Sequence, residues 1–177
     1  MDRLEGALNM REAIDLLETA ARHEDAGATV VSPRLNTNFD GGWMRILFAV
    51  DSASGYFATK SYHLIKGSGV RYVVSLYALK DGALIAMLDG RAITDLRTGA
   101  ASGVVARQAP IAGPVEIGII GSGYQARTQL ASLAAVYNVA SATVYSPTAA
   151  NRERFAREMS AQLGFPVTAA ASAEAAV

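Results

Sequence analysis

The stretch Val115 to Ala126, VEIGIIGSGYQA, decides the fold of this 177-residue chain. Its first six residues form an apolar run of strand length, and the glycine-rich turn GSGYQA follows directly and opens a helical pattern. This order matches the G-x-G-x-x-[GA] fingerprint of dinucleotide-binding folds. We therefore predict a strand, a tight turn at Gly121 and a helix from about Tyr124 whose N-terminus faces the phosphates of a bound dinucleotide.

The residue types in this turn each have a physical reason. Gly121 permits the tight turn, Gly123 lets the backbone approach a pyrophosphate, and Ala126 lets the helix lie close to the strand. The other turn residues are assigned to the same cofactor-binding site: Ser122, Tyr124 and Gln125. A strand-turn-helix unit without any ligand is the alternative that the motif alone leaves open.

Beyond the turn, helical and strand-like patterns alternate. The pattern predicts helices over about 124–137 and 148–163, with a second strand from Ala142 to Tyr145 between them. A β-α-β-α order is typical of a parallel sheet with crossover helices. We therefore predict a partial Rossmann domain in which two strands of the parallel sheet are present.

The end of that second strand bears on the choice of cofactor. The usual fingerprint places an acidic residue there to bind the adenosine ribose, whereas this chain reads Tyr145-Ser146-Pro147-Thr148. Without a carboxylate there is no repulsion of a ribose phosphate, and Ser146, Thr148 and Arg152 are candidate donors to one. NADP is therefore at least as well supported as NAD, although an arginine on a helix surface is more often only solvated.

The first half of the chain has the pattern of a small, mainly antiparallel sheet with a helix against it. Asn9 and Glu12 have capping-box spacing before a helix that ends ahead of Gly27. Extended runs then begin at residue 35 and continue at residues 43–50, 56–62, 72–79 and 83–88. Glycine-containing turns at residues 40–42 and 80–82 separate neighbouring runs. The sequence thus predicts a mixed α+β unit that precedes the Rossmann unit.

A second helix is predicted from a cap at Thr94 or Asp95 to about Gln108. It is rich in alanine and glycine, and its glycines lower helix propensity by roughly 1 kcal/mol each, so close packing must hold it. Pro110, Gly113 and Pro114 follow and mark a boundary. We therefore predict domains at 1–112 and 113–177.

The bulk composition excludes several classes of function. Lysine plus arginine and aspartate plus glutamate both number 16, so no net field attracts nucleic acid or an acidic membrane. The chain has no cysteine and two histidines, which excludes thiolate and histidine-rich metal sites. Residues 1–10 lack the apolar core of a signal peptide and no stretch is long enough to span a bilayer, so the cytoplasm is expected.

Taken together, several segments resemble the ornithine cyclodeaminase/mu-crystallin family in order and spacing. These segments are Pro33-Arg34, Ala58-Thr59-Lys60, Asp89-Gly90 with Thr94, residues 96–102 (LRTGAAS), and the GSGYQA turn. The resemblance covers nearly the whole chain. It implies an N-terminal substrate-binding and dimerisation domain, then the Rossmann domain, and a nicotinamide dinucleotide as cofactor.

The resemblance also implies a substrate site. Arg34 and Arg97 would hold the substrate carboxylate, Lys60 would lie beside its α-carbon nitrogen or carbonyl as the catalytic group, and Thr98 would contact the cofactor. The physical case agrees, because the planar fork of arginine pairs bidentately with carboxylates and lysine is a compact proton donor. Arg97, predicted in a first helical turn, would oppose the helix dipole unless an anion binds there. The simpler alternative is that these cations are surface charges or pair with acids such as Asp95.

The implied activity is hydride transfer at the α-carbon of a small amino, imino or keto acid, carried out by a homodimer. We expect the chain to be truncated within its cofactor domain and to lack the catalytic carboxylate that the cyclodeaminases use. A binding protein without turnover, or an inactive truncated family member, is the alternative.

Overall fold

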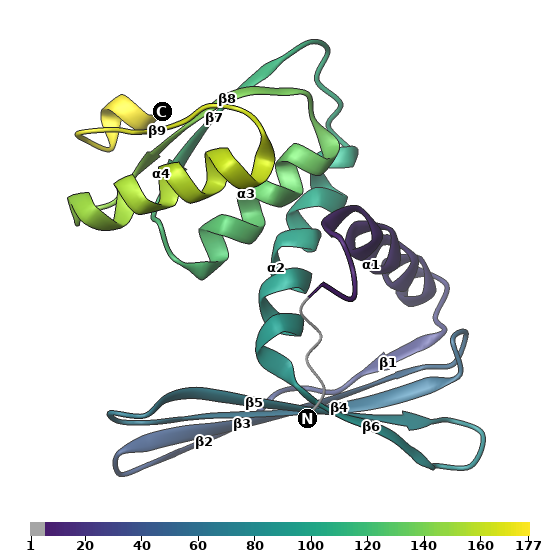
Figure 1. Cartoon of the computed structure of the whole chain (residues 1–177). Helices are drawn as coiled ribbons and strands as arrows, with labels where there is room; N and C mark the ends of the chain where they lie inside the picture. The colour runs from purple at the N-terminus through teal and green to yellow at the C-terminus, as the bar shows by residue number, and fades with distance from the viewer. Residues whose placement is uncertain (1–5) are drawn as a thin grey trace. The chain divides into compact units, whose positions relative to one another are not determined.

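The computed structural model describes residues 6–177 (Figure 1). Their packing forms two compact units, one containing residues 18–94 and the other containing residues 9–17 and 95–177. The division falls inside two helices, because residues 10–17 of the first helix and residues 95–107 of the second pack with the C-terminal unit. The predicted domain boundary between residues 112 and 113 remains a prediction. The parallel sheet begins at Val115, two residues after it.

The first unit contains an antiparallel sheet of six strands (Figure 1). A mainly antiparallel sheet was predicted, but its first short strand, at residues 29–31, was not. The path of the sheet runs β1-β3-β4-β5-β6, and β2 pairs with β3 beside that path. The strands are β1 (Thr29–Val31), β2 (Leu35–Phe39), β3 (Gly42–Asp51), β4 (Tyr56–Ile65), β5 (Gly69–Ala78) and β6 (Leu84–Asp89). Gly41 and Gly82 have positive φ values of 81° and 73°, which is why the two predicted turns contain glycine.

Helix α1 (Met10–Asp25) begins with the predicted capping box. The Asn9 N–H donates to Glu12 Oε2 at 2.9 Å, and the Glu12 N–H donates to Asn9 Oδ1 at 3.0 Å. Ile14 is buried on this helix, whereas Ala20 and Ala21, which share its helical period, are exposed. The apolar stripe is therefore used mainly in the first two turns.

Helix α2 (Gly90–Arg107) begins earlier than predicted. Asp89 Oδ1 accepts a hydrogen bond from the Arg91 N–H at 2.9 Å, so the helix starts directly from the end of β6. Thr94 and Asp95 therefore lie inside the helix and do not cap it, and Arg97 is not in its first turn. The expected conflict between Arg97 and the helix dipole is consequently wrong, since the dipole effect fades after one turn.

The second unit contains the predicted parallel sheet, but with three strands rather than two. Its order is β7 (Val115–Ile120), β8 (Val139–Tyr145) and β9 (Val167–Ala169), connected by α3 (Tyr124–Val136) and α4 (Ala149–Leu163). The third strand was missed because three residues are too few to show a period. A short 3-10 helix, η1 (Glu174–Ala176), follows it.

Helices α3 and α4 pack on one face of the parallel sheet. Leu130 of α3, Val144 of β8, and Phe155 and Met159 of α4 form a fully buried core. On the opposite face η1 covers Gly118, where an added Cβ would lie 2.2 Å from the Ala176 carbonyl oxygen. The fold is thus α/β, with an N-terminal mainly antiparallel α+β part followed by a partial Rossmann βαβαβ part. No helix of residues 6–177 is long and apolar enough to cross a membrane.

Candidate functional site

The glycine turn lies between β7 and α3, as the fingerprint predicts. Gly121 has φ 109°, a conformation that side-chain-bearing residues rarely adopt. Gly123 is the N-cap of α3, no side chain caps that terminus, and a Cβ added to Gly123 would meet nothing within 4 Å. Glycine is therefore favoured at these two positions for different reasons. The backbone conformation requires it at Gly121, whereas at Gly123 it leaves space that is open to a ligand.

The rest of the turn is tied to its surroundings. Ala126 packs against the buried core under the helix, in agreement with its predicted role. Gln125 Nε2 donates to Asp95 Oδ1 at 3.5 Å, and Gln129 Nε2 donates to the Thr98 carbonyl oxygen at 3.1 Å. The side chain of Tyr124 is 68% exposed. The turn is therefore anchored from α2, while its outer edge stays accessible.

The end of β8 lies beside this turn. Ser122 Oγ donates to Ser146 Oγ at 2.8 Å, and Ser146 is buried. Arg152 Nη1 donates to the Ser146 carbonyl oxygen at 3.0 Å, and its guanidinium lies 5.7 Å from the centre of the Tyr145 ring. Thr148 is exposed at the N-cap of α4. Ser146 and Arg152 thus hold the strand end in place, and Thr148 is the more accessible polar group.

An open hollow of about 760 Å³ adjoins the turn. Ser122, Gly123 and Tyr124 line one side, and side chains of α3 and α4 that sequence reasoning missed line the rest: Arg127, Asn151, Arg154 and Glu158. Arg154 Nη2 donates to Asn151 Oδ1 at 3.1 Å, while Arg127 forms an ion pair with Glu158. The spacing of Asn151 and Arg154, three residues apart on one helix, is the signal that places both on the same side.

In the antiparallel unit, Lys60 is the best-anchored candidate. Its Nζ donates to Thr94 Oγ1 at 2.8 Å, and Thr94 Oγ1 in turn donates to the Gly90 carbonyl oxygen at 2.5 Å. Thr94 is buried, so the ammonium is held at one place above the sheet. Its Nζ also lies 5.3 Å and 5.2 Å from the ring centres of Tyr62 and Tyr72.

The strand register divides this sheet into two chemically different faces. Residues directly opposite each other in an antiparallel pair point to the same side. The pairs Leu47–Lys60, Arg45–Tyr62 and Tyr62–Tyr72 therefore place one set of side chains together, which we call the Lys60 face: Trp43, Arg45, Leu47, Lys60, Tyr62 and Tyr72. The other side, which we call the open face, carries Leu35, Phe39, Met44, Ile46 and Phe48, each between 38% and 67% exposed.

The two arginines predicted to bind a carboxylate lie apart in the chain and differ in setting. Arg34 is exposed just before β2, and its carbonyl oxygen accepts a hydrogen bond from Asn36 Nδ2 at 3.3 Å. Arg97 is exposed on α2, in the second unit. Trp43, Arg45, Tyr62 and Tyr72 were given no role by sequence reasoning, because their shared face depends on the strand register.

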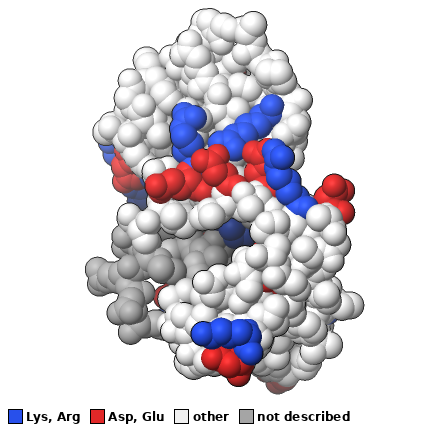
Figure 2. Space-filling model, turned by 90° about the vertical axis from the view of Figure 1, so that its right-hand side faces the viewer, with Lys and Arg blue, Asp and Glu red and all other residues white. Residues whose placement is uncertain are grey.

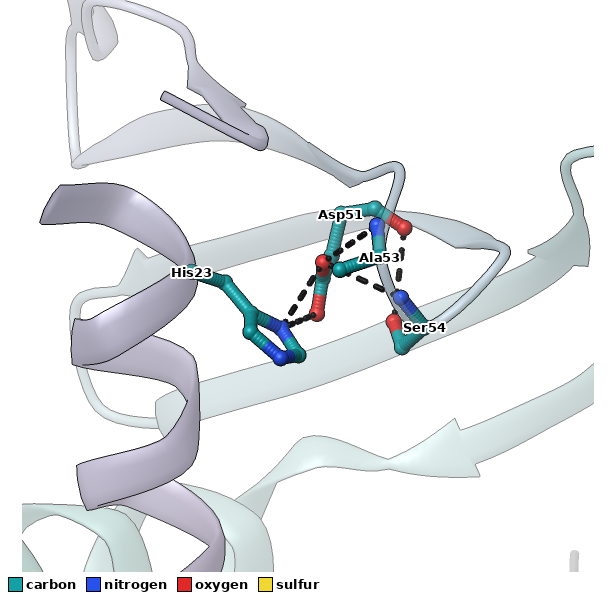
Figure 3. A network of polar contacts seen from close by, with 4 residues as sticks. All are labelled: His23, Asp51, Ala53 and Ser54. Atoms are coloured by element: carbon teal, nitrogen blue, oxygen red, sulfur yellow. Dashed lines mark hydrogen bonds and ion pairs between the residues drawn. The ribbon is translucent and has the colours of Figure 1, made fainter. Parts of the chain in front are cut away.

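A separate polar network closes the turn between β3 and β4 (Figure 3). His23 Nδ1 lies 2.9 Å from Asp51 Oδ2, and the Ala53 and Ser54 N–H groups donate to Asp51 Oδ1 at 3.1 Å and 3.2 Å. Hydrogen bonding from the His23 imidazole lowers the pKa of Asp51 from 3.8 to about 2. This network connects α1 to the sheet within the first unit.

Charged side chains of both signs lie together on one face of the described chain (Figure 2). Figure 2 shows Lys and Arg side chains lying next to Asp and Glu side chains on the visible face, without a separate patch of one sign. Among residues 6–177 no group of three or more His, Asp or Glu side chains could hold a metal ion.

Comparisons with known proteins agree with these features. The family model described as "Ornithine cyclodeaminase/mu-crystallin family" matches residues 1–177. The alanine dehydrogenase of Archaeoglobus fulgidus is 29% identical over 150 residues, which cover 81% of this chain and 46% of that protein.

Two solved structures share the fold closely. One is the Thermococcus litoralis Δ1-pyrroline-2-carboxylate reductase in complex with NADH and L-proline, with a TM-score of 0.91 and 32% identity over 98% of this chain and 56% of that chain. The other is an archaeal alanine dehydrogenase dimer with bound NAD, with a TM-score of 0.87 and 26% identity over 97% of this chain and 55% of that chain. The chain thus spans about half the length of these relatives.

Proposed function

Since the chain belongs to the ornithine cyclodeaminase/mu-crystallin family, we propose that it functions as an NAD(P)-dependent oxidoreductase of small amino or imino acids. The observation that carries this proposal is the uncapped N-terminus of α3 behind a glycine turn with open space at Gly123. A pyrophosphate fits there, because N–H groups and the positive end of the helix dipole favour an anion. The nicotinamide would supply the hydride chemistry when bound.

We assign the cofactor contacts to the residues around this turn. Backbone groups of the turn hold the phosphates, and residues at the end of β8 and on α2 complete the contacts: Gly121, Ser122, Gly123, Tyr124, Gln125, Ala126, Ser146, Thr148, Arg152 and Thr98. The Ser122–Ser146 hydrogen bond supports the assignment of the adenosine contacts, since it connects the turn to the end of β8.

We assign the substrate to the cations predicted from the sequence. Arg34 and Arg97 pair with the substrate carboxylate through their planar forks. Lys60 Nζ donates a hydrogen bond, and a proton where the reaction needs one, to the nitrogen or oxygen on the α-carbon. The bond from Lys60 to the buried Thr94 supports this role, because a lysine held by one acceptor presents its charge in a defined direction.

We further propose a homodimer formed through the open face of the antiparallel sheet. That face exposes the five large apolar side chains named above, which is unusual for a surface that stays in water. The archaeal alanine dehydrogenase with the same fold is a dimer, which supports the proposal.

The cofactor assignment is tested by titrating residues 1–177 with NADH and NADPH, following nicotinamide fluorescence. Wild-type protein should bind at least one of them. Gly123→Val should abolish binding while the melting temperature changes little, because the new side chain meets no protein atom within 4 Å of its Cβ. Gly121→Ala is the matched control for strain, and it should lower the melting temperature since Gly121 has φ 109°. Unchanged affinity in Gly123→Val would remove the claim.

A further inference from the structure

The Lys60 face carries a second cation that the proposed function does not use. Arg45 lies on β3 between Asn36 of β2 and Tyr62 of β4 in the strand register. Its guanidinium carbon lies 4.3 Å from the centre of the Trp43 ring and 6.0 Å from that of the Tyr62 ring. Arg45 is half-buried, so aromatic rings take the place of part of the hydration shell of its guanidinium.

Among residues 6–177, the contacts of the Arg45 guanidinium are with aromatic rings, and none of them is a hydrogen bond to its N–H groups. Aromatic rings interact with the plane of a guanidinium, whereas its five N–H donors point outward in that plane. Within the described part of the chain, no carboxylate forms an ion pair with Arg45 and no acceptor forms a hydrogen bond with its side chain. A guanidinium that is partly shielded from water and has no carboxylate partner binds a planar anion strongly.

Arg45 is also placed close to the group that would face the reacting carbon. Lys60 lies opposite Leu47, and Arg45 is two residues from Leu47 on the same strand. Diagonal neighbours of this kind have backbones about 7–8 Å apart. Both cations also lie within 6.0 Å of the centre of the same Tyr62 ring. One short ligand can therefore contact both.

We propose that Arg45 binds a second acidic group of the substrate, so that the chain selects an amino or imino dicarboxylic acid. This inference rests on the proposed function, since it takes Lys60 as the neighbour of the α-carbon. A cationic side chain would be repelled by Arg45, and the rings that attract cations already have Arg45 or Lys60 close to them. An apolar side chain would cover Arg45 and leave its donors unpaired, which is unfavourable.

The test compares ligands that differ in their side chain. Residues 1–177 are titrated by calorimetry with L-aspartate, L-alanine and L-ornithine at pH 7, and the emission of Trp43 is followed in parallel. Trp43 is the only tryptophan and contacts Arg45, so its emission reports on this position directly. We expect aspartate to bind about tenfold or more tightly than alanine, since each charge-assisted hydrogen bond contributes roughly that factor. Ornithine should bind most weakly.

Variants separate the two carboxylate positions. Arg45→Gln should reduce aspartate affinity to the alanine level and leave alanine affinity unchanged, and Arg45→Lys should be intermediate because it keeps the charge without the fork. Arg71→Gln is the matched control, because Arg71 lies opposite His63 on the other face of the same sheet. Thermal melts establish that each variant is folded.

The outcomes distinguish this inference from the proposed function. Equal affinities for aspartate and alanine, or an equal loss of both in Arg45→Gln, would overturn the role of Arg45. If alanine then still binds and Lys60→Gln weakens it, the proposed function stands alone. If none of the amino acids binds, the proposed function and this inference fail together.

Discussion

At the scale of single residues, Ser146 is where this chain departs from the usual dinucleotide fingerprint. An acidic residue there would bind the adenosine ribose and repel a ribose phosphate. Ser146 is instead a buried hydroxyl that accepts a hydrogen bond from Ser122. Residues 145–148 therefore carry no carboxylate that would repel a phosphate, and the exposed Thr148 and Arg154, which lines the adjoining hollow together with Glu158, offer polar groups nearby.

We predict that NADPH binds at least as tightly as NADH and that Ser146→Asp shifts the preference toward NADH. The introduced carboxylate would repel the ribose phosphate and accept the Ser122 hydrogen bond that Ser146 accepts now. Parallel titrations of both cofactors measure the ratio of dissociation constants. Asn138→Asp adds the same charge just before β8, at the opposite end of that strand, and should leave the ratio unchanged. A wild-type preference for NADH would mean that the strand-end argument is wrong.

Asp51 gives a second prediction at this scale. Because the His23 hydrogen bond lowers its pKa from 3.8 to about 2, the folded state holds the carboxylate ionised. A depressed pKa stabilises the fold above the unfolded value, and that stability is lost as the pH falls from about 4 through about 2. Melting temperatures measured from pH 5 to pH 2 should fall less steeply in Asp51→Asn than in the wild type. Asp40→Asn, in the exposed turn before β3, should keep the wild-type slope.

At the scale of elements, α2 depends on packing rather than on its own propensity. Two of its glycines, Gly99 and Gly103, allow neighbouring helices to approach closely. A Cβ on Gly99 would lie 2.5 Å from the Thr128 carbonyl oxygen of α3, and one on Gly103 would lie 2.4 Å from Ile14 of α1. These contacts explain why an alanine- and glycine-rich segment with low intrinsic stability forms a helix of 18 residues.

We predict that Gly99→Ala destabilises the protein, although alanine favours helices by about 1 kcal/mol over glycine. The clash is with backbone atoms of α3, which cannot rotate away, and overpacking of this kind costs about 1–3 kcal/mol. Denaturant unfolding followed by circular dichroism measures the difference. Val105→Ala, at a position 70% exposed on the same helix, should change little. A more stable Gly99→Ala variant would show that the helices can separate freely.

At the scale of the whole molecule, the open face of the antiparallel sheet is the surface through which we propose that the dimer forms. If the proposed dimer forms there, Phe48→Asp should shift residues 1–177 from dimer to monomer in analytical ultracentrifugation. The reason is that a buried carboxylate without a partner opposes association. Val105→Asp adds a carboxylate at an exposed apolar position of α2 and should leave the dimer intact. Dimers that persist in Phe48→Asp would place the interface elsewhere.

The sequence by itself determined the features that depend on neighbours along the chain. The capping box of Asn9 and Glu12, the glycine turns at Gly41 and Gly82, and the strand-turn-helix unit around Gly121 were all predicted and are confirmed. Each involves residues a few positions apart, whose backbone conformation or hydrogen bonds do not need the rest of the fold.

Only the tertiary structure decided the features that depend on distant residues. The bond from Lys60 to Thr94 joins positions 34 apart, and the Arg45 stack requires the register of β3 and β4. The start of α2 at Gly90 and the third parallel strand, β9, were also not predictable from local patterns. The physical reason is that a one-residue shift of register moves every side chain of a strand to the other face. Residue types along the chain therefore indicate a substrate site, but strand pairing decides which of them share it.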